Sequence, residues 1–304
     1  ELNEGYVDLR NLGDLSSFLE NISIRAGRWQ MFYGDHRLIG HLNWTNAGRK
    51  WNGARVKWDN KKGSWIDFFA TVVQEDSTGA VSGDAVSRDT EKDELFWGLY
   101  THFKDPLGFK GIAAEPYLII RDRSTSDRSD TGADSGEERY SAGLRLAGKK
   151  VPSLPGVDFT LEQTWQFGHV ETVVQQGAAA SNPIQAFAGA WGLGYTFSDV
   201  SWSPRVGYQY AFASGDEDPD NGADKTFNQL YPTGHARLGY IDFHGYQNIR
   251  AHKAMLTLKP TKKLLMKADL WFFEADEEAD DWISVAGGVN RQGGDIYQNR
   301  KGTG

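Results

Sequence analysis

The chain alternates apolar and polar residues over segments of about ten residues, which is typical of β-strands with two unlike faces. In residues 64–75, Ile66 and Phe68 fall on one face, whereas Asp67 and Thr71 fall on the other. The same pattern predicts strands at residues 5–12, 22–34, 53–59, 95–104, 112–123, 138–147, 157–167, 184–197, 204–214, 250–259 and 264–273. The sequence therefore predicts an all-β fold with about twelve strands.

The connections between these segments alternate in length. Short turns are predicted at residues 59–64, 105–111, 149–156, 198–203 and 259–263. Long, polar and mostly acidic loops are predicted at residues 35–51, 76–93, 124–138, 171–183, 215–248 and from 276 onward. Tight turns on one side and long loops on the other are typical of an antiparallel transmembrane β-barrel. We therefore interpret residues 1–304 as a single transmembrane β-barrel domain.

A soluble β-sandwich, such as a carbohydrate-active lectin-like protein, would show the same alternation of residues. Its turns would recur every 8–12 residues or so, whereas short turns recur here about every 45 residues, which favours the barrel. Because a barrel leaves no free strand edge, and because the chain starts at Glu1 and stops at Gly304 within a polar stretch, we expect further strands beyond both ends.

The composition agrees with a barrel. No apolar run approaches the roughly 18 residues of a membrane helix. The mean hydropathy of -0.56 is compatible with a barrel, because only every second strand residue faces lipid. The chain is rich in rings (Trp 11, Tyr 12, Phe 16), as expected for residues at membrane interfaces. The absence of Cys excludes thiolate chemistry, and the net charge of -8 speaks against nucleic acid as a partner.

Two stretches carry a family resemblance. Residues 26–51 are AGRWQMFYGDHRLIGHLNWTNAGRKW, and residues 210–248 are YAFASGDEDPDNGADKTFNQLYPTGHARLGYIDFHGYQN. They resemble the alginate-export family of bacterial outer-membrane β-barrels, in which a GRQ-like strand precedes YGDxRLIG, and YAxASGD precedes a Y/F-P-T-G-H motif. The chain departs slightly from the pattern, with Gly27-Arg28-Trp29-Gln30 at the GRQ position and Asn43-Trp44 at a DW-like pair.

The resemblance implies a barrel of roughly 16–18 strands in the bacterial outer membrane, with no cofactor. It implies a porin-like channel that passes an anionic, alginate-like polysaccharide or another polar solute by diffusion. Expected partners are outer-membrane lipid and lipopolysaccharide, the saccharide itself and periplasmic export proteins. The alternative is a structural or assembly barrel whose lumen is filled by a partner protein.

A polyanion channel requires fixed positive charges along its wall. The candidates for the lumen or a constriction loop are Arg25, Arg28, Arg37, Arg49, Arg55, Arg121, Arg145 and Arg205. Arg28 is in phase with the apolar residues of its strand, so a bulge or a position at the end of the apolar band is required. Salt bridges with Asp67, Glu115, Asp158 and Glu162 would instead make the arginines purely structural, and the sequence leaves both interpretations open.

Loop 215–248 adds His235 and Arg237 to the candidates. A loop of this length is unusual in a compact protein unless it is functional or disordered, and the resemblance favours an ordered plug or lid over a solvated surface loop. Asp216, Asp218 and Asp220 alternate as in a calcium-binding loop, but the distal Glu of such loops is absent. The alternative is a solvated acidic loop. No nucleophile, phosphate or metalloprotease motif is present, so an enzyme is not expected.

Overall fold

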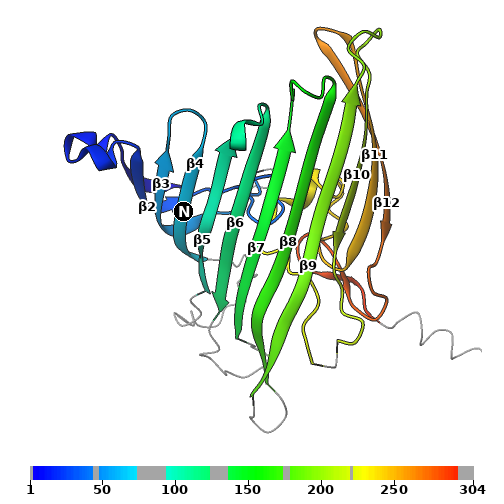
Figure 1. The fold of residues 1–304 in the computed structure, drawn as a ribbon. Coiled ribbons are helices and arrows are strands. Elements are labelled where there is room, and N and C mark those ends of the chain that lie inside the picture. Colours follow the sequence, from blue (N-terminus) through cyan, green and yellow to red (C-terminus); the bar gives the residue numbers. More distant parts are fainter. Residues whose placement is uncertain are drawn as a thin grey trace, which may run out of the picture.

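One antiparallel sheet of twelve strands contains most of the regular structure in the computed structural model (Figure 1). The structure describes residues 3–43, 48–73, 94–123, 136–173, 179–219 and 222–293. Each strand pairs with the strands before and after it in the chain. The strands are β1 (Gly5–Leu9), β2 (Ile22–Trp29), β3 (Trp51–Asp59), β4 (Trp65–Val73), β5 (Glu94–Lys104), β6 (Ile112–Arg123), β7 (Glu137–Gly148), β8 (Val157–Val173), β9 (Ala179–Thr196), β10 (Arg205–Ala213), β11 (Ile249–Thr261) and β12 (Leu264–Glu274). This order confirms the predicted all-β antiparallel fold.

The strand boundaries differ from the prediction at a few ends. Strand β2 stops at Trp29, because the chain then leaves the sheet, and Gly34 takes a left-handed φ of 51° in the following segment. Strands β8 and β9 are longer than predicted, with 17 and 18 residues, and form the longest hairpin of the sheet. The period of two therefore locates each strand but not the point at which a hairpin stops pairing.

The two faces of the sheet differ in chemistry. The outward face exposes large apolar side chains such as Phe68, Leu99, Leu118 and Trp191. The opposite face, here called the inner face, buries polar and charged side chains from the same strands, among them Asp67, Glu115, Arg121, Arg139, Ser141, Arg145, Glu162, Thr164 and Gln166. An apolar outward face with a polar interior is typical of a membrane barrel.

Two segments of the chain cover this inner face. Residues 30–43, the first inner segment, and residues 222–248, the second inner segment, cross behind the strands in Figure 1. A parallel bridge joins Ile39 to Tyr231, where the Gly40 N–H donates to the Tyr231 carbonyl at 2.8 Å. The Tyr231 N–H donates in turn to the Leu38 carbonyl at 2.9 Å. The inner segments therefore hold each other as well as the sheet.

The short turns lie at one end of the sheet, toward the top of Figure 1. The same end holds three short 3-10 turns, η1 (Leu12–Asp14), η2 (Ser17–Leu19) and η3 (Pro106–Gly108). A fourth 3-10 turn, η4 (Gly234–Ala236), lies in the second inner segment, and a small hairpin of β13 (Trp282–Ile283) and β14 (Val289–Arg291) was not predicted. In the part of the chain that is described, no helix is long and apolar enough to cross a membrane.

Candidate functional site: a charged wall and its covering segments

The alternation of the strands brings most of the predicted arginines to one face. Arg25 and Arg55 are directly paired across β2 and β3, and Arg55 contacts the inner-face Asp67. Arg121 and Arg145 are buried on the inner face of β6 and β7. Arg205 lies at the start of β10, where it bonds Asp158 of β8. These five arginines therefore share the inner face of the sheet, at different heights along their strands. Their common face follows from the two-residue period of a β-strand, in which alternate side chains point to the same side.

Arg28 lies on the other face. The pairing of β2 with β3 has no register shift, so Arg28 stays in phase with Ile22, Ile24 and Ala26 and lies opposite Asn52. Of the two requirements for this residue, a bulge or an end position, the structure has the second, because β2 ends at the next residue, Trp29. Arg28 is thus placed at the rim of the apolar band rather than on the charged wall.

The arginines of the wall are paired with carboxylates. Asp158 accepts two bonds from Arg205 at 2.6 and 2.7 Å, and Asp8 accepts two from Arg25 at 2.6 and 2.7 Å. Each of the four carboxylates predicted as a salt-bridge partner contacts one arginine of the predicted set: Asp67 contacts Arg55, Glu115 contacts Arg145, Asp158 contacts Arg205, and Glu162 contacts Arg37. The wall therefore carries fixed guanidinium groups whose charge is balanced locally.

The inner segments meet the wall at a balanced cluster of ions. Arg145 of β7 donates to Glu115 of β6 at 2.8 Å and to Asp35 of the first inner segment at 2.9 Å. Arg237 of the second inner segment donates from Nε to the backbone carbonyl of Asp35 at 2.6 Å. Arg37 lies 3.4 Å from Glu162 of β8. The cluster thus joins both inner segments to three adjacent strands.

The electrostatics of the first inner segment follow from this cluster. Burial alone would raise the pKa of the Asp35 carboxyl, but Arg145, Arg37 and Arg237 outweigh it, so the pKa is lowered. Burial, together with the nearby His41 and Arg237, lowers the pKa of His36 to about 4. Asp35 is therefore anionic and His36 neutral at pH 7.

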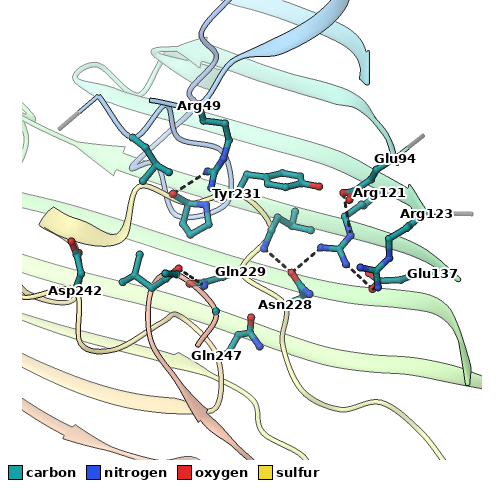
Figure 2. Close-up of a pocket in the computed structure, with 16 residues that line it drawn as sticks. Arg49, Glu94, Arg121, Arg123, Glu137, Asn228, Gln229, Tyr231, Asp242 and Gln247 are labelled. Atoms are coloured by element: carbon teal, nitrogen blue, oxygen red, sulfur yellow. Dashed lines mark hydrogen bonds and ion pairs between the residues drawn. The ribbon is translucent and has the colours of Figure 1, made fainter. Parts of the chain in front are cut away.

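A cavity of about 570 Å³ lies between the wall and the second inner segment (Figure 2). Arg121 is the centre of its polar lining and contacts Glu137 at 2.7 Å, Asn228 at 3.4 Å and Glu94 at 3.6 Å. Arg123 lies beside Glu137 and leaves 44% of its side chain exposed. The lining also includes Gln229, Gln247, Tyr231, Arg49 and Asp242. The volume falls within the range of about 300–1,000 Å³ that is usual for small-molecule sites.

Three further predicted residues support the inner segments. They are Arg49 of the first loop and His235 and Arg237 of the long loop. Arg49 donates to the carbonyls of Gly40 at 3.2 Å and Pro232 at 3.1 Å, and therefore braces the point where the two segments meet. His235 contacts Asp242 at 2.9 Å within the second segment, whereas Arg237 bonds across to Asp35. The structure thus brings Arg49 to the cavity and places His235 and Arg237 in the covering layer.

The predicted calcium loop is organised by its own backbone. Asp216 is buried and accepts bonds from the N–H groups of Asp218 at 3.1 Å and Lys225 at 3.2 Å. Asp218 is exposed, and Asp220 lies outside the described residues. Among the residues that the structure describes, no group of three His, Cys, Asp or Glu side chains is placed to hold a metal ion. Calcium at this loop therefore stays a prediction.

The list of candidates drawn from the sequence omitted several polar residues of the charged wall and of the cavity. Arg139 is 3% exposed and contacts Glu137, Gln166 at 3.0 Å and Asp224 at 2.7 Å. The sequence does contain a signal for Arg139, because Arg139, Ser141 and Arg145 occupy alternate positions of β7 and so share one face. Gln166 carried the same signal, since it shares the parity of Glu162 and Thr164 on β8. The amide of Asn228 had no such signal, because Asn228 approaches the wall through the path of the second inner segment.

Comparison with known proteins agrees with this architecture. A search of curated proteins finds no match. The family model described as "Alginate export" matches residues 1–303 and confirms the resemblance. This family is a transport family rather than an enzyme family, and the match supports a polysaccharide export channel of the outer membrane. The chain, with its charged wall and apolar outward face, belongs to the alginate export family.

Proposed function

We propose that the chain forms the wall of an outer-membrane channel through which an anionic polysaccharide diffuses along the arginines of the inner face. The observation that carries the proposal is the set of arginines on one face of the sheet, each held in place by carboxylates, on strands from β2 to β10. The family match and the apolar outward face support the location in the outer membrane. No energy source is needed, since diffusion down a gradient is sufficient.

The paired state of the arginines suits transport better than a row of bare cations would. A channel must bind its solute strongly enough to admit it and weakly enough to release it. When a uronate carboxylate approaches Arg121, it replaces Glu137 or Glu94 as the partner, so one carboxylate is exchanged for another. The free-energy change of each exchange is small, and no single arginine traps the chain.

The inner segments define the closed state of this channel. They cover the wall in the described structure, and the ion cluster around Asp35 fastens them to β6, β7 and β8. The cavity beside Arg121 and Arg123 is the space in which a saccharide unit would first replace a wall carboxylate. Lipopolysaccharide at the outer surface and export proteins on the periplasmic side remain the expected partners of such a channel.

The test is single-channel recording of the full-length protein in planar bilayers of zwitterionic lipid, with reversal potentials in a salt gradient and an oligouronate as blocker. We expect anion selectivity and block by the oligouronate. Changing Arg121→Gln and Arg123→Gln together should weaken the block about tenfold, because two charge-assisted hydrogen bonds to the solute are lost. The matched control, Arg10→Gln with Lys110→Gln, removes the same charge from exposed positions that do not line the cavity and should leave the block unchanged.

A cation-selective or silent channel would overturn the proposal, as would an oligouronate block that is equal in both double variants. In that case the arginines would serve only to hold the wall together.

A further inference from the structure

The short-turn end of the sheet carries a group of exposed lysines. Two lie in the turn between β3 and β4 and two in the turn between β7 and β8, whereas the β5–β6 and β11–β12 connections add lysines in the turn and at the strand ends. The members of this lysine rim are Lys61, Lys62, Lys104, Lys110, Lys149, Lys150, Lys259, Lys262 and Lys263, all of them exposed. Each lies in a short connection or at the strand end beside it, so the rim is fixed by the sheet itself.

The rim differs from the charged wall because its charges are not balanced. Lys61 lies 3.3 Å from Glu20, and both side chains are exposed. For the other lysines of the rim, the described part of the chain offers no ion pair. At the opposite end, a hollow is lined mainly by acids, namely Asp122, Glu137, Glu138 and Glu171, together with Arg123 and His169. Among the described residues, lysines therefore prevail at the short-turn end and acids in this hollow at the other end.

Exposed apolar side chains lie in the connections at the same end of the sheet as these lysines. Leu107 in η3 is 96% exposed, Phe18 in η2 is 80% exposed, and Trp202 in the β9–β10 turn is 56% exposed. Phe109 and Leu154 are exposed in the same way on the turns that carry Lys110 and Lys150. Lysines combined with exposed rings and leucines are typical of a surface that lies in the headgroup region of a bilayer.

The β11–β12 turn contains a cavity in which lysines and leucines lie together. This cavity of about 470 Å³ is lined by three lysines, two leucines and one threonine: Lys259, Thr261, Lys262, Lys263, Leu264 and Leu265. Lysine ammonium groups bind phosphate as point charges. Leucines next to them suit the acyl chains of the same molecule.

From these observations we infer that the lysine rim binds the phosphate headgroups of anionic phospholipid in the leaflet that the short turns face. The inference rests on the proposed outer-membrane location, in which short turns face the periplasm. An anionic saccharide would match the lysines but not the exposed Leu107, Phe109 and Trp202, which gain nothing from a hydrated glycan. A lipid matches both sets of residues. The charge asymmetry between the two ends then favours one orientation of the sheet in the membrane.

The experiment measures which lipids surround the full-length protein in nanodiscs prepared from phosphatidylcholine and a minor fraction of phosphatidylglycerol. Tightly held lipids are counted by native mass spectrometry at low and high salt. We expect phosphatidylglycerol to be enriched several-fold over its bulk fraction, and the enrichment to fall as salt rises. The variant Lys149→Gln, Lys150→Gln, Lys262→Gln and Lys263→Gln should lose most of the enrichment, whereas the same four positions changed to Arg should keep it, since the charge is retained.

Correct folding of every variant is checked by the gel mobility of the unheated protein. Equal lipid composition around the Gln and Arg variants would overturn the inference, as would loss of oligouronate binding in the Gln variant without any change in lipid. Failure of the two proposals can be told apart, because conductance is recorded in zwitterionic lipid. A conducting protein without lipid enrichment refutes only the lysine rim, and an enriched but silent protein refutes only the channel.

Discussion

At the scale of single residues, the inner segments depend on groups whose ionisation is set by burial. His36 is the clearest case, since its ring lies next to His41, with ring centroids 5.1 Å apart, and near Arg237. Its backbone has a φ of 59°, in the left-handed region. Asn is one of the few residues that adopts this region readily, so it can replace the side chain and preserve the backbone.

We predict that acid loosens the first inner segment through His36. The pKa is lowered from 6.5 to about 4 in the folded protein, so between these values the unfolded segment binds more protons than the folded one. The free energy needed to open the segment is therefore highest near pH 7 and falls as the pH drops through this window. The loss is on the order of 1 kcal/mol after allowance for the partial exposure of the ring. Hydrogen exchange of residues 30–43, corrected for the intrinsic rate at each pH, measures the effect.

His36→Asn should remove this pH dependence, whereas His169→Asn on the outward side of β8 should retain it. Identical pH profiles for the wild type and His36→Asn would contradict the prediction.

At the scale of elements, the sequence identifies strands much better than the segments that cover them. Strand β6 occurs at residues 112–123 as predicted, because Tyr117, Ile119 and Arg121 share one parity and their neighbours share the other. The same rule places Arg55, Arg121, Arg145 and Arg205 on the wall. No periodic rule describes residues 30–43 or 222–248, whose position depends on contacts far along the chain.

The pairing of arginines illustrates the same limit. Parity gives the face of Arg145 but not its contact with Asp35, which belongs to a loop 110 residues away. Likewise the cavity could not be predicted, since Asn228 and Gln229 reach it through the fold of the second inner segment.

We predict that the two inner segments can join only because residue 40 is glycine and has no side chain. A Cβ atom at this position would lie 2.2 Å from Thr233 Oγ1 and 2.5 Å from its backbone nitrogen. Gly40→Ala should therefore force the segments apart at a cost of about 1–3 kcal/mol, as overpacking usually does. Faster hydrogen exchange in both segments, with the strands unchanged, is the expected result.

The control is Gly192→Ala on the inner face of β9, where the nearest neighbour of a Cβ atom lies at 3.7 Å. This variant should exchange like the wild type. If Gly40→Ala loosens only the first segment, the bridge between Ile39 and Tyr231 does not couple them.

At the scale of the whole molecule, the outward face determines the environment in which the sheet is stable. Apolar side chains on adjacent strands, such as Leu99 on β5 and Leu118 on β6, lie opposite each other and remain exposed. In water such a surface would favour association, and in a bilayer it contacts lipid. The charges, in contrast, are collected on the inner face and at the turns.

We predict a depth-dependent cost for an arginine on this outward face. Leu118→Arg lies in the middle of β6 and should destabilise the folded protein in liposomes by about 2–4 kcal/mol, whereas Leu107→Arg at the short-turn end should cost about 0–1 kcal/mol. Urea unfolding in phospholipid vesicles measures both. Equal costs at the two positions would show that the middle of the outward face does not contact the hydrocarbon core.

The bridge between Ile39 and Tyr231 has a consequence for biogenesis. The first inner segment follows β2, whereas the second inner segment, to which the bridge joins it, comes after β10 in the chain. The ion pairs of the first segment with Arg145 of β7 and Glu162 of β8 can form as soon as those strands are present. The bridge itself requires Tyr231, so the joined covering layer is completed only after ten strands of the sheet have been synthesised.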